Sequence, residues 1–285
     1  MQLIDGKLLS KKVQNHVRTS VEELKREYGV VPGLAVIIVG DDPASHAYVG
    51  MKEKACKNVG FYSIAHKMPN TITQNEIIEI ITMMNNNPHI HGILVQLPLP
   101  EHIDTDAILE VIDPQKDVDG FHPCNIGRMV TNLKSFVACT PLGVMRMFEE
   151  YNIDLEGKDV VVVGASNIVG KPMAALLLNA NATVTVTHIH TKDLTQHTRN
   201  ADIIIVGVGL PGLIKEDMVK EGAIVIDIGI NRLESGQLVG DVDYDAVAPK
   251  CSYITPVPGG VGPMTIAMLL ENTLKSAQLL HKGNE

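Results

Sequence analysis

A tyrosine and a lysine spaced four residues apart are the first residues of this chain that could do chemistry. Tyr48 and Lys52 stand in the stretch 45–59, which has the composition of a helix, so the phenol and the amine would share one helical face. A phenol and an amine can both take part in proton transfer. The same spacing is common on ordinary helix surfaces, so the pair by itself leaves a catalytic and a purely structural interpretation open.

Gln96 and Asp119 are two further polar residues in unusual settings. Gln96 closes an otherwise apolar strand, where a buried amide needs a hydrogen-bonding partner. Asp119 stands in the tight turn Lys116 to Gly120, which could aim its carboxylate inward. A solvated acidic turn and an anchor for a substrate are both compatible with this spacing.

The acidic cluster around Asp119 does not fit a calcium-binding EF-hand loop. With Gly120 at the sixth position of an EF-hand loop, the first position is Gln115 and the twelfth is Ile126, where acidic ligands are required. The eleven histidines form no ligand pattern either, and His188 and His190 alternate at a strand end, which suits cofactor contact or exposure. The sequence therefore predicts no metal site.

A glycine-bounded turn provides a candidate phosphate site. The apolar strand 160–163 runs into Gly164, and Gly170 precedes a helix-like segment that extends to Ala180. Gly164 can take backbone angles that a Cβ forbids, Gly170 allows close packing of helix and strand, and N–H groups at the helix start attract a pyrophosphate. The Gly-x5-Gly spacing differs from the Gly-x-Gly-x-x-Gly fingerprint, so tight packing without a ligand is an alternative.

The elements around these residues predict an α/β fold with two domains. Short apolar or β-branched runs alternate with helical segments throughout the chain, as in parallel sheets covered on both faces. Because ligands gather at the carboxyl ends of such strands, chemistry is expected just after Val39 and around Gln96. The expected strands are 34–39, 90–97, 182–187, 203–206, 223–228 and 253–255, and the expected helices are 45–59, 74–85, 173–180, 194–200, 216–220 and 263–281.

The length of 285 residues exceeds what one core usually covers, so two domains separated by a cleft are expected. Residues 1–139 would form the first α/β domain. Residues 140–263 would form a doubly wound, Rossmann-type domain with a parallel sheet. A final helix over about 264–285 would pack back onto the first domain.

Composition excludes several classes of partner. A net charge of −9 with no dense basic run argues against nucleic acid, and no apolar stretch approaches the roughly 18 residues that span a bilayer. The amino-terminal residues lack a secretory signal, and the four cysteines form no Cys-x-x-Cys pair. These features predict a cytoplasmic protein with reduced thiols.

A Tyr-x3-Lys pair also occurs in short-chain dehydrogenases, but the order of motifs differs here. In that family the pair follows an amino-terminal phosphate turn, whereas Tyr48 precedes Gly164 and belongs to another predicted domain.

Five motifs in this order resemble one family, the bifunctional methylenetetrahydrofolate dehydrogenase/methenyltetrahydrofolate cyclohydrolases. The resemblance runs nearly from end to end. The motifs are Asp41-Asp42-Pro43-Ala44-Ser45 followed by Tyr48-x3-Lys52, Val95-Gln96-Leu97-Pro98-Leu99-Pro100, Lys116-Asp117-Val118-Asp119-Gly120, the segment from Gly164 to Pro172, and the segment from Thr255 to Thr265.

The resemblance implies two reactions on one folate substrate. The first is oxidation of 5,10-methylenetetrahydrofolate to 5,10-methenyltetrahydrofolate by hydride transfer to NADP, and the second is hydrolysis of that product to 10-formyltetrahydrofolate. Positioning is the main demand of the first reaction, and proton transfer is an added demand of the second. A homodimer formed through the second domain is also implied.

The resemblance assigns the catalytic and substrate-binding roles residue by residue. Lys52 would transfer protons during hydrolysis, Gln96 would orient Lys52, and Tyr48 would pack on the aromatic part of the substrate. Asp119 would accept two parallel N–H bonds from the pterin. The further substrate-binding residues implied are Val95, Leu97, Pro258, Gly259 and Gly260.

The resemblance also assigns cofactor contacts, with some departures from the family pattern. The implied contacts are Gly164, Ala165, Ser166, Gly170, Ile189, Ile230 and Thr140. Relatives commonly carry basic residues at the positions of Ala165, Ile189 and Leu210, so an enzyme that prefers NAD, or has only the dehydrogenase activity, is an alternative. A protein that senses nucleotide without catalysis is a second alternative function. His188, His190 or Lys192 could supply positive charge in place of the missing residues.

Overall fold

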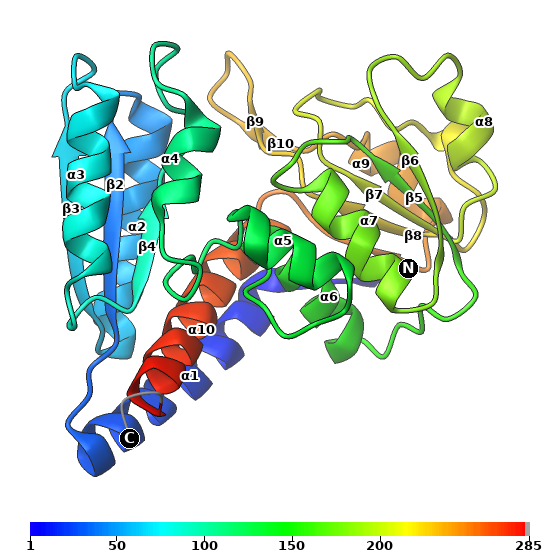
Figure 1. Cartoon of the computed structure of the whole chain (residues 1–285). Coiled ribbons are helices and arrows are strands. Elements are labelled where there is room, and N and C mark those ends of the chain that lie inside the picture. The colour runs from blue at the N-terminus through cyan, green and yellow to red at the C-terminus, as the bar shows by residue number, and fades with distance from the viewer. Residues whose placement is uncertain (283–285) are drawn as a thin grey trace. The chain divides into compact units, whose positions relative to one another are not determined.

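A computed structural model describes residues 1–282 of the chain, which divides into two compact units. Residues 12–128, 134–139 and 266–282 form one unit, here called the three-stranded unit after its sheet. Residues 1–11, 129–133 and 140–265 form the other, the six-stranded unit. Helices α1 (Gly6–Tyr28) and α10 (Val261–Lys282) each begin in the six-stranded unit and end in the three-stranded unit (Figure 1).

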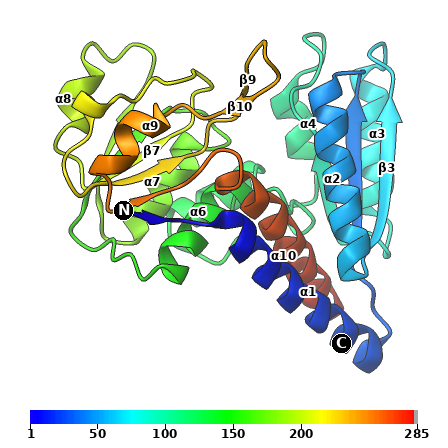
Figure 2. The same cartoon turned by 180° about the vertical axis from the view of Figure 1, so that it is seen from behind.

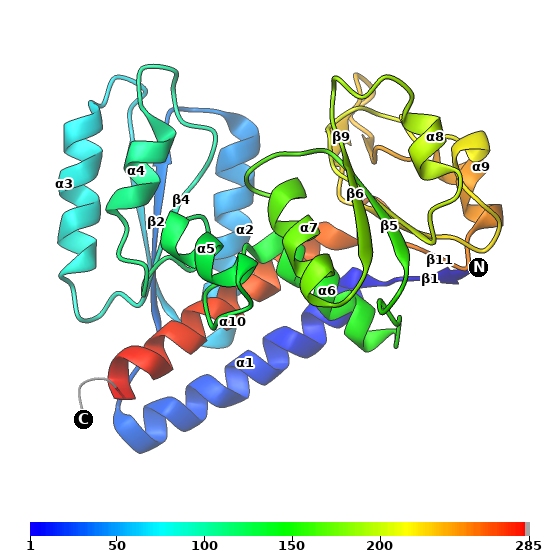
Figure 3. The same ribbon diagram turned by 45° about the vertical axis from the view of Figure 1, so that its right-hand side comes forward.

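The three-stranded unit is built around β2 (Gly33–Val39), in which every residue is buried. It pairs in parallel with β3 (Tyr62–Met68) on one side and β4 (Gly92–Val95) on the other. Helix α2 (Pro43–Val59) covers one face of this sheet, and α3 (Gln74–Asn85) covers the other (Figure 3). The remaining helices are α4 (Thr105–Val111), which packs with α3, and α5 (Pro123–Val130).

Strand order in this unit creates a switch point at the carboxyl ends of β2 and β4. The chain crosses from β2 to β3 on one side and returns to β4 on the other side, so the order is β3-β2-β4. Apolar side chains from α3, α4 and the facing side of the sheet form one core, which includes Ile77, Ile108 and Ile93. Figure 2 shows α2 in front of the sheet with α3 beyond it.

The six-stranded unit contains a parallel sheet in the order β1-β11-β8-β7-β5-β6. Two neighbouring strands, β5 and β7, are followed in the chain by crossovers in opposite directions, which produces a second switch point at their carboxyl ends. The strands are β1 (Gln2–Leu3), β5 (Asp159–Val163), β6 (Thr183–Thr187), β7 (Ile203–Val206), β8 (Ile224–Asp227) and β11 (Tyr253–Ile254).

Helices cover both faces of the six-stranded sheet, with α7 on one face and α8 and α9 on the other (Figure 3). An antiparallel hairpin of β9 (Asn231–Arg232) and β10 (Leu238–Val239) follows β8. The helices are α6 (Cys139–Glu150), α7 (Gly170–Asn179), α8 (Leu194–Thr198), α9 (Tyr244–Val247) and the 3-10 helices η1 (Glu216–Met218) and η2 (Ala248–Lys250).

The α/β class with a doubly wound parallel sheet is confirmed, and several element bounds are corrected. The expected strand 90–97 is shorter, because Ile90 donates to the carbonyl of Asn87 in a turn and the prolines after Leu97 supply no N–H group for a ladder. The expected helix 216–220 is a single 3-10 turn. The final helix begins at Val261, and the part of it expected at residues 283–285 lies outside the described residues.

Candidate functional site

Helix α2 brings Lys52 to a buried position beside the end of β4. The helix begins with Pro43, and the carboxylate of Asp42 caps it by accepting a hydrogen bond from the Ser45 N–H at 2.7 Å. Val49 and Cys56 lie on the buried face together with Lys52, because they are three and four residues away. The Lys52 side chain is 5% exposed, which is unusual for a lysine and calls for polar partners.

Gln96 is the hydrogen-bonding partner of Lys52. The Lys52 Nζ donates to the Gln96 Oε1 at 3.0 Å. The Gln96 Nε2 donates to the Leu97 carbonyl at 2.8 Å, and this bond turns the amide so that its oxygen faces the lysine. The Tyr48 ring lies beside the same ammonium group, with 4.8 Å between Nζ and the ring centroid. Tyr48, Lys52 and Gln96 therefore form one cluster. The spacing predicted that Tyr48 and Lys52 share a helical face, and the family resemblance implied the bond between Gln96 and Lys52.

Asp119 belongs to the same cluster, as its electrostatic effect on Lys52 shows. Burial lowers the pKa of Lys52, and the nearby Asp119 charge opposes that change. Burial raises the pKa of Asp119, and the Lys52 charge opposes it in turn. Each group thus favours the charged form of the other, while the low-dielectric surroundings favour the neutral forms. Opposing shifts of this kind, caused by burial and a specific charged partner, are typical of functional sites.

The turn that presents Asp119 is held by its neighbour Asp117. The buried Asp117 carboxylate accepts hydrogen bonds from the main-chain N–H groups of Gly120, Phe121 and His122 at 3.1, 3.2 and 2.9 Å, and from the Asn125 side chain at 2.8 Å. Asp117 is therefore neither a solvated acid nor a substrate anchor, and its role in the fold was missed from the sequence. Nothing in the local sequence marks this role, because Asp117 resembles any acid in a polar turn.

Helix α10 and Lys116 secure the same turn from two sides. The Asn272 Nδ2 on α10 donates to the carbonyls of Val118 and Val137 at 2.9 and 3.1 Å. The buried Lys116 Nζ donates to the carbonyls of Met84, Asn85 and Asn87. The position of Asp119 is thus fixed by elements far apart in the sequence.

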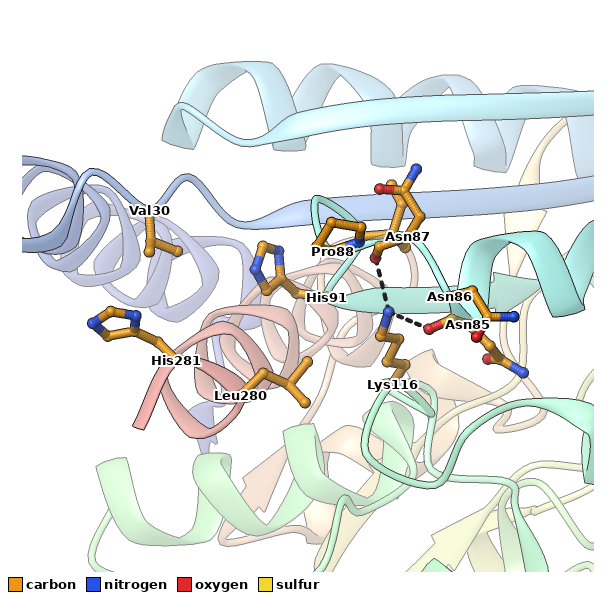
Figure 4. A pocket seen from close by; sticks show the side chains of 10 residues that line it. Val30, Asn85, Asn86, Asn87, Pro88, His91, Lys116, Leu280 and His281 are labelled. Atoms are coloured by element: carbon orange, nitrogen blue, oxygen red, sulfur yellow. Dashed lines mark hydrogen bonds between the residues drawn. The ribbon is translucent and has the colours of Figure 1, made fainter. Parts of the chain in front are cut away.

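A cavity of about 270 Å³ lies at the opposite end of the three-stranded sheet (Figure 4). Residues that precede β2 and β4, including His91, line it together with Lys116, which follows β4, and His281 on α10. The Lys116 Nζ is turned to main-chain carbonyls, and the His91 Nδ1 accepts from the Gly33 N–H at 3.0 Å. These two polar groups support the fold, and Lys52 and Gln96 do not line this cavity.

The turn after β5 in the six-stranded unit has the shape of a phosphate cradle. Gly164 has a φ of +117°, and a Cβ on Gly170 would overlap the Gly164 carbonyl oxygen. The Ser166 Oγ accepts from the N–H groups of Val169 and Gly170 at 3.2 and 3.4 Å, which leaves its own hydrogen available to a ligand. Within residues 1–282, the N–H groups of Ala165 and Asn167 donate to no protein atom. These groups fit a dinucleotide pyrophosphate.

The other expected cofactor residues lie in the same unit. Ile189 follows β6 and is 94% exposed, and Ile230 follows β8 and is 54% exposed. The Thr140 hydroxyl on α6 pairs with the Thr265 hydroxyl at 2.9 Å. The rings of His188 and His190 pack edge to face after β6, with 5.8 Å between their centroids.

Pro258, Gly259 and Gly260 lie between β11 and α10 in the six-stranded unit, whereas Val95 and Leu97 flank Gln96 in the three-stranded unit. Gly259 has a φ of +108°, and its carbonyl accepts from the Lys7 N–H at 2.9 Å. A Cβ on Gly260 would overlap the Pro256 carbonyl, at a separation of 2.5 Å. This segment therefore depends on glycine for its shape.

Asp227 and Asp241 are two buried acids that sequence reasoning did not single out. They are 4% and 0% exposed, and both lie near the carboxyl end of β8. An aspartate that ends an apolar strand run, as Asp227 does, was the available signal.

The described part of the chain has neither a metal-binding cluster nor a membrane-spanning helix. Among residues 1–282, no group of three or more His, Cys, Asp or Glu side chains is placed to hold a metal ion. No helix in that range combines the length and apolar character that crossing a membrane requires.

Family models match both parts of the chain. Residues 4–119 match the catalytic domain of tetrahydrofolate dehydrogenase/cyclohydrolase, and residues 138–281 match the NAD(P)-binding domain of the same family. The Bifunctional protein FolD of Sulfurovum sp. strain NBC37-1 is 78% identical over 98% of this chain and 99% of its own. The protein of the same name from Sulfurimonas denitrificans is 67% identical over the full length of both chains.

Solved structures agree with these matches. The bifunctional FolD methylenetetrahydrofolate dehydrogenase/cyclohydrolase of Campylobacter jejuni has a TM-score of 0.97 and 58% identity, over 98% of this chain and 99% of its own. The Trypanosoma brucei FolD, complexed with NADP and an inhibitor, has a TM-score of 0.94 and 40% identity over 97% of each chain. Two matched domain models, near-complete coverage and a shared fold lead to one conclusion: the chain belongs to the tetrahydrofolate dehydrogenase/cyclohydrolase family.

Proposed function

We propose that Lys52 carries the hydrolytic half of a two-step reaction on a one-carbon folate. The chain is a bifunctional enzyme that oxidises 5,10-methylenetetrahydrofolate to 5,10-methenyltetrahydrofolate with NADP and then hydrolyses this product to 10-formyltetrahydrofolate. The observation that carries the assignment of Lys52 is its buried amine, bonded to Gln96 and coupled to Asp119.

Asp119 and Tyr48 bind the folate in this proposal. The Asp119 carboxylate accepts two parallel hydrogen bonds from the 2-amino group and N3–H of the pterin, which fixes the rotation of the ring as well as its position. Tyr48 packs on the aromatic part of the substrate. Val95 and Leu97 border the same end of β4, and we assign Pro258, Gly259 and Gly260 to the substrate as well.

The dehydrogenase step depends on positioning. NADP accepts the hydride, so the task of the protein is to hold the reacting carbon in line and keep water away. Gly164, Ala165, Ser166 and Gly170 hold the pyrophosphate through main-chain N–H groups and a hydroxyl in this proposal. The remaining cofactor contacts proposed are Thr140, Ile189 and Ile230.

The hydrolytic step needs a proton acceptor and then a donor. As a neutral amine, Lys52 takes a proton from the water that adds to the methenyl carbon. As an ammonium ion, it returns that proton to N5 when the bond between N5 and this carbon breaks, and the hydroxyl proton leaves to solvent. The lowered pKa of Lys52 supports this role, because it increases the share of neutral amine near pH 7.

Replacing the amine tests this assignment. In Lys52→Met we expect hydrolysis of supplied 5,10-methenyltetrahydrofolate to fall by about 100-fold or more, because one proton-transfer group is lost, while folate binding stays within a few fold. Absorbance of the methenyl compound follows the reaction. Lys54→Met is the matched control, since Lys54 is exposed on the same helix, and it should behave as wild type. Retained hydrolysis in Lys52→Met would remove this lysine from the mechanism.

Preference between NADP and NAD is a second property to measure. Ile189 and Leu210 present exposed apolar side chains in the six-stranded unit, and Ala165 offers no charge. Initial rates with the two cofactors compare them directly, and we expect NADP to give the higher kcat/KM. The wild-type dehydrogenase assay also separates an enzyme from a protein that only senses nucleotide.

We also propose that the chain forms a homodimer in the cytoplasm. Strand β6 ends the six-stranded sheet, so its outer edge has no partner strand within the described chain. Val186 on β6 and Leu178 on α7 are 40% and 58% exposed, and α7 contacts β6. An open strand edge beside exposed apolar side chains suits pairing with a second copy. Four unpaired cysteine thiols support a reducing compartment.

A further inference from the structure

Asp227 and Asp241 form a linked pair of buried carboxylates beside the cofactor-binding edge of the six-stranded sheet. Asp227 is the last residue of β8, and Asp241 follows the β9–β10 hairpin. Neither carboxylate has a lysine or arginine partner among the described residues. Isolated buried charges are costly, so their hydrogen bonds must explain why they are tolerated.

Asp241 joins two loops that follow neighbouring strands. Its Oδ2 accepts from the N–H groups of Val208 and Gly209 at 2.6 and 3.0 Å, in the loop after β7. Its Oδ1 accepts from the Asn231 Nδ2 at 2.8 Å, at the start of the hairpin after β8. Asn231 follows Ile230, so the carboxylate ties the Ile230 segment to the loop after β7.

Asp227 holds the main chain of Asp241 in place. The Asp227 Oδ1 accepts from the N–H groups of Gly229 and Asp241 at 2.9 and 3.0 Å, and its Oδ2 accepts from the Val242 N–H at 2.9 Å. The Asp227 N–H donates to the Thr255 hydroxyl at 2.8 Å. The backbone of one acid is therefore bonded to the side chain of the other.

Two glycines make room for these carboxylates. A Cβ on Gly229 would overlap the carboxyl group of Asp241, and a Cβ on Gly240 would overlap that of Asp227. The chain thus lacks side chains where each carboxylate needs close access to main-chain N–H groups. Burial raises the pKa of Asp227 to about 6, while its N–H donors and the nearby Asp241 act in opposite directions on it.

The loop tied by Asp241 is next to the phosphate turn. A Cβ on Gly164 would lie 2.8 Å from the Gly207 carbonyl, so the turns after β5 and β7 touch at the switch point where dinucleotides bind. Ile230, on the other side of the carboxylate, is the residue proposed to contact the nicotinamide half.

We propose that Asp241, held by Asp227, is a positioning residue for hydride transfer that fixes the loop 207–209 and the segment 230–231 against the nicotinamide half of NADP. This inference rests on the proposed function, because it takes Ile230 as a cofactor contact. Hydrolysis of supplied 5,10-methenyltetrahydrofolate consumes no cofactor, so it should be nearly independent of this pair.

Two substitutions at Asn231 test the proposal. Asn231→Ala removes one hydrogen bond to Asp241, whereas Asn231→Asp keeps the shape and places a second carboxylate against the first. We expect Asn231→Asp to raise the Kd for NADPH and the KM for NADP by about tenfold or more at pH 8, and Asn231→Ala to raise them less. NADPH fluorescence gives the Kd without turnover. If Asn231 only filled space, the isosteric aspartate would be the milder change.

The pH dependence of Asn231→Asp provides a readout that packing alone would not give. Two facing carboxylates can share a proton, so the defect should shrink as the pH falls from 8 to about 5.5. The acid that faces residue 231 is Asp241, and Asp227 is bonded in turn to the main chain of Asp241. The neighbouring Arg232 is turned to the Gly236 carbonyl at 3.5 Å.

An exchange of the two side chains tests their pairing. Asp241→Asn should weaken NADPH binding, and combining it with Asn231→Asp should restore part of the loss, because one amide and one carboxylate again face each other. Asp202→Asn is the control, since Asp202 precedes β7 at the opposite end of the sheet and bonds the Asp159 N–H at 2.9 Å. It should bind NADPH as wild type does.

The outcomes distinguish this inference from the proposed function. If wild type oxidises 5,10-methylenetetrahydrofolate with NADP, but Asn231→Asp binds NADPH as wild type does, the positioning role is wrong and the function stands. If hydrolysis falls as much as NADPH binding in Asn231→Asp, the pair supports the fold in general and the proposal also fails. If wild type itself shows no NADP-dependent oxidation, the proposed function fails first.

Discussion

Lys52 combines burial with two different kinds of partner. Gln96 supplies a neutral oxygen at 3.0 Å, and Asp119 supplies a charge that acts on the lysine through space. A neutral acceptor orients an amine in either protonation state, whereas a carboxylate mainly stabilises the ammonium form. The balance between the two suits a group that must both take and return a proton.

Removing the neutral acceptor should expose this balance. In Gln96→Leu we expect hydrolysis to fall by about tenfold or more, because the amine loses its orientation. The pH profile of hydrolysis should shift to lower pH, because loss of the acceptor disfavours the ammonium ion and lowers the pKa of Lys52 further. Activity measured between pH 6 and 9 checks both expectations.

Gln196→Leu provides a control for this measurement, because Gln196 is exposed on α8 in the other unit. An unchanged pH profile in Gln96→Leu, together with normal folding, would show that Gln96 does not tune the lysine.

The sequence was informative about Lys52 and Gln96 and silent about Asp117. Lys52 and Gln96 stand in patterns that place polar groups on apolar elements, and the structure brings them together. Asp117 looks like any acid in a polar turn, and its burial depends on N–H groups three to five residues later and on Asn125. These hydrogen bonds depend on the backbone conformation of the whole turn, which composition does not reveal.

At the scale of elements, strong local signals predicted structure well. Helix α3 matches its expected bounds, because Thr73 and Glu76 form a capping box and isoleucines follow on one face. Strand β3 was missed, since His66 and Lys67 interrupt its apolar character at the edge of the sheet. Its pairing with β2 is a tertiary effect, and edge strands carry weaker patterns than central ones. Helices α1, α4, α5, α6 and α9 were also not anticipated.

Strand β6 gives a prediction about assembly. We expect the wild-type chain to run at twice its mass of 30.9 kDa, and Val186→Lys to shift it to the monomer, because a charge on this strand opposes burial against a second copy. Light scattering after size-exclusion chromatography measures the mass.

The matched control is Leu279→Lys, on an exposed position of α10 in the three-stranded unit. It should remain a dimer. A wild-type monomer at micromolar concentration would contradict the proposal, and so would a dimer that survives Val186→Lys.

At the scale of the whole molecule, His91 links stability to pH. Burial lowers its pKa from 6.5 to about 4, and Lys116 adds to the effect. Between these values the unfolded chain binds more protons than the folded one, so the stabilising contribution of His91 is present above about pH 6.5 and is lost as the pH falls toward 4. A difference of this size is equivalent to about 3 kcal/mol.

The variant His91→Asn should isolate this contribution. Its side-chain oxygen can replace the Nδ1 that accepts from the Gly33 N–H, and it does not titrate. As the pH falls from 7 to 4.5, we expect the thermal midpoint of wild type to decrease more than that of the variant. Calorimetric scans at several pH values measure it, and a constant difference would contradict the assignment.

Strand β1 gives the molecule a particular order of assembly during synthesis. Gln2 and Leu3 pair with Tyr253 and Ile254, so the outermost strand of the larger sheet emerges from the ribosome about 250 residues before its neighbour. Chains generally fold from the amino terminus onward, yet β1 cannot pair with β11 until almost the whole polypeptide has been synthesised. A nucleotide-binding fragment that contained only residues 140–265 would lack β1, so β11 would become an edge strand with unpaired main-chain N–H and C=O groups. Unpaired edge strands of this kind promote aggregation.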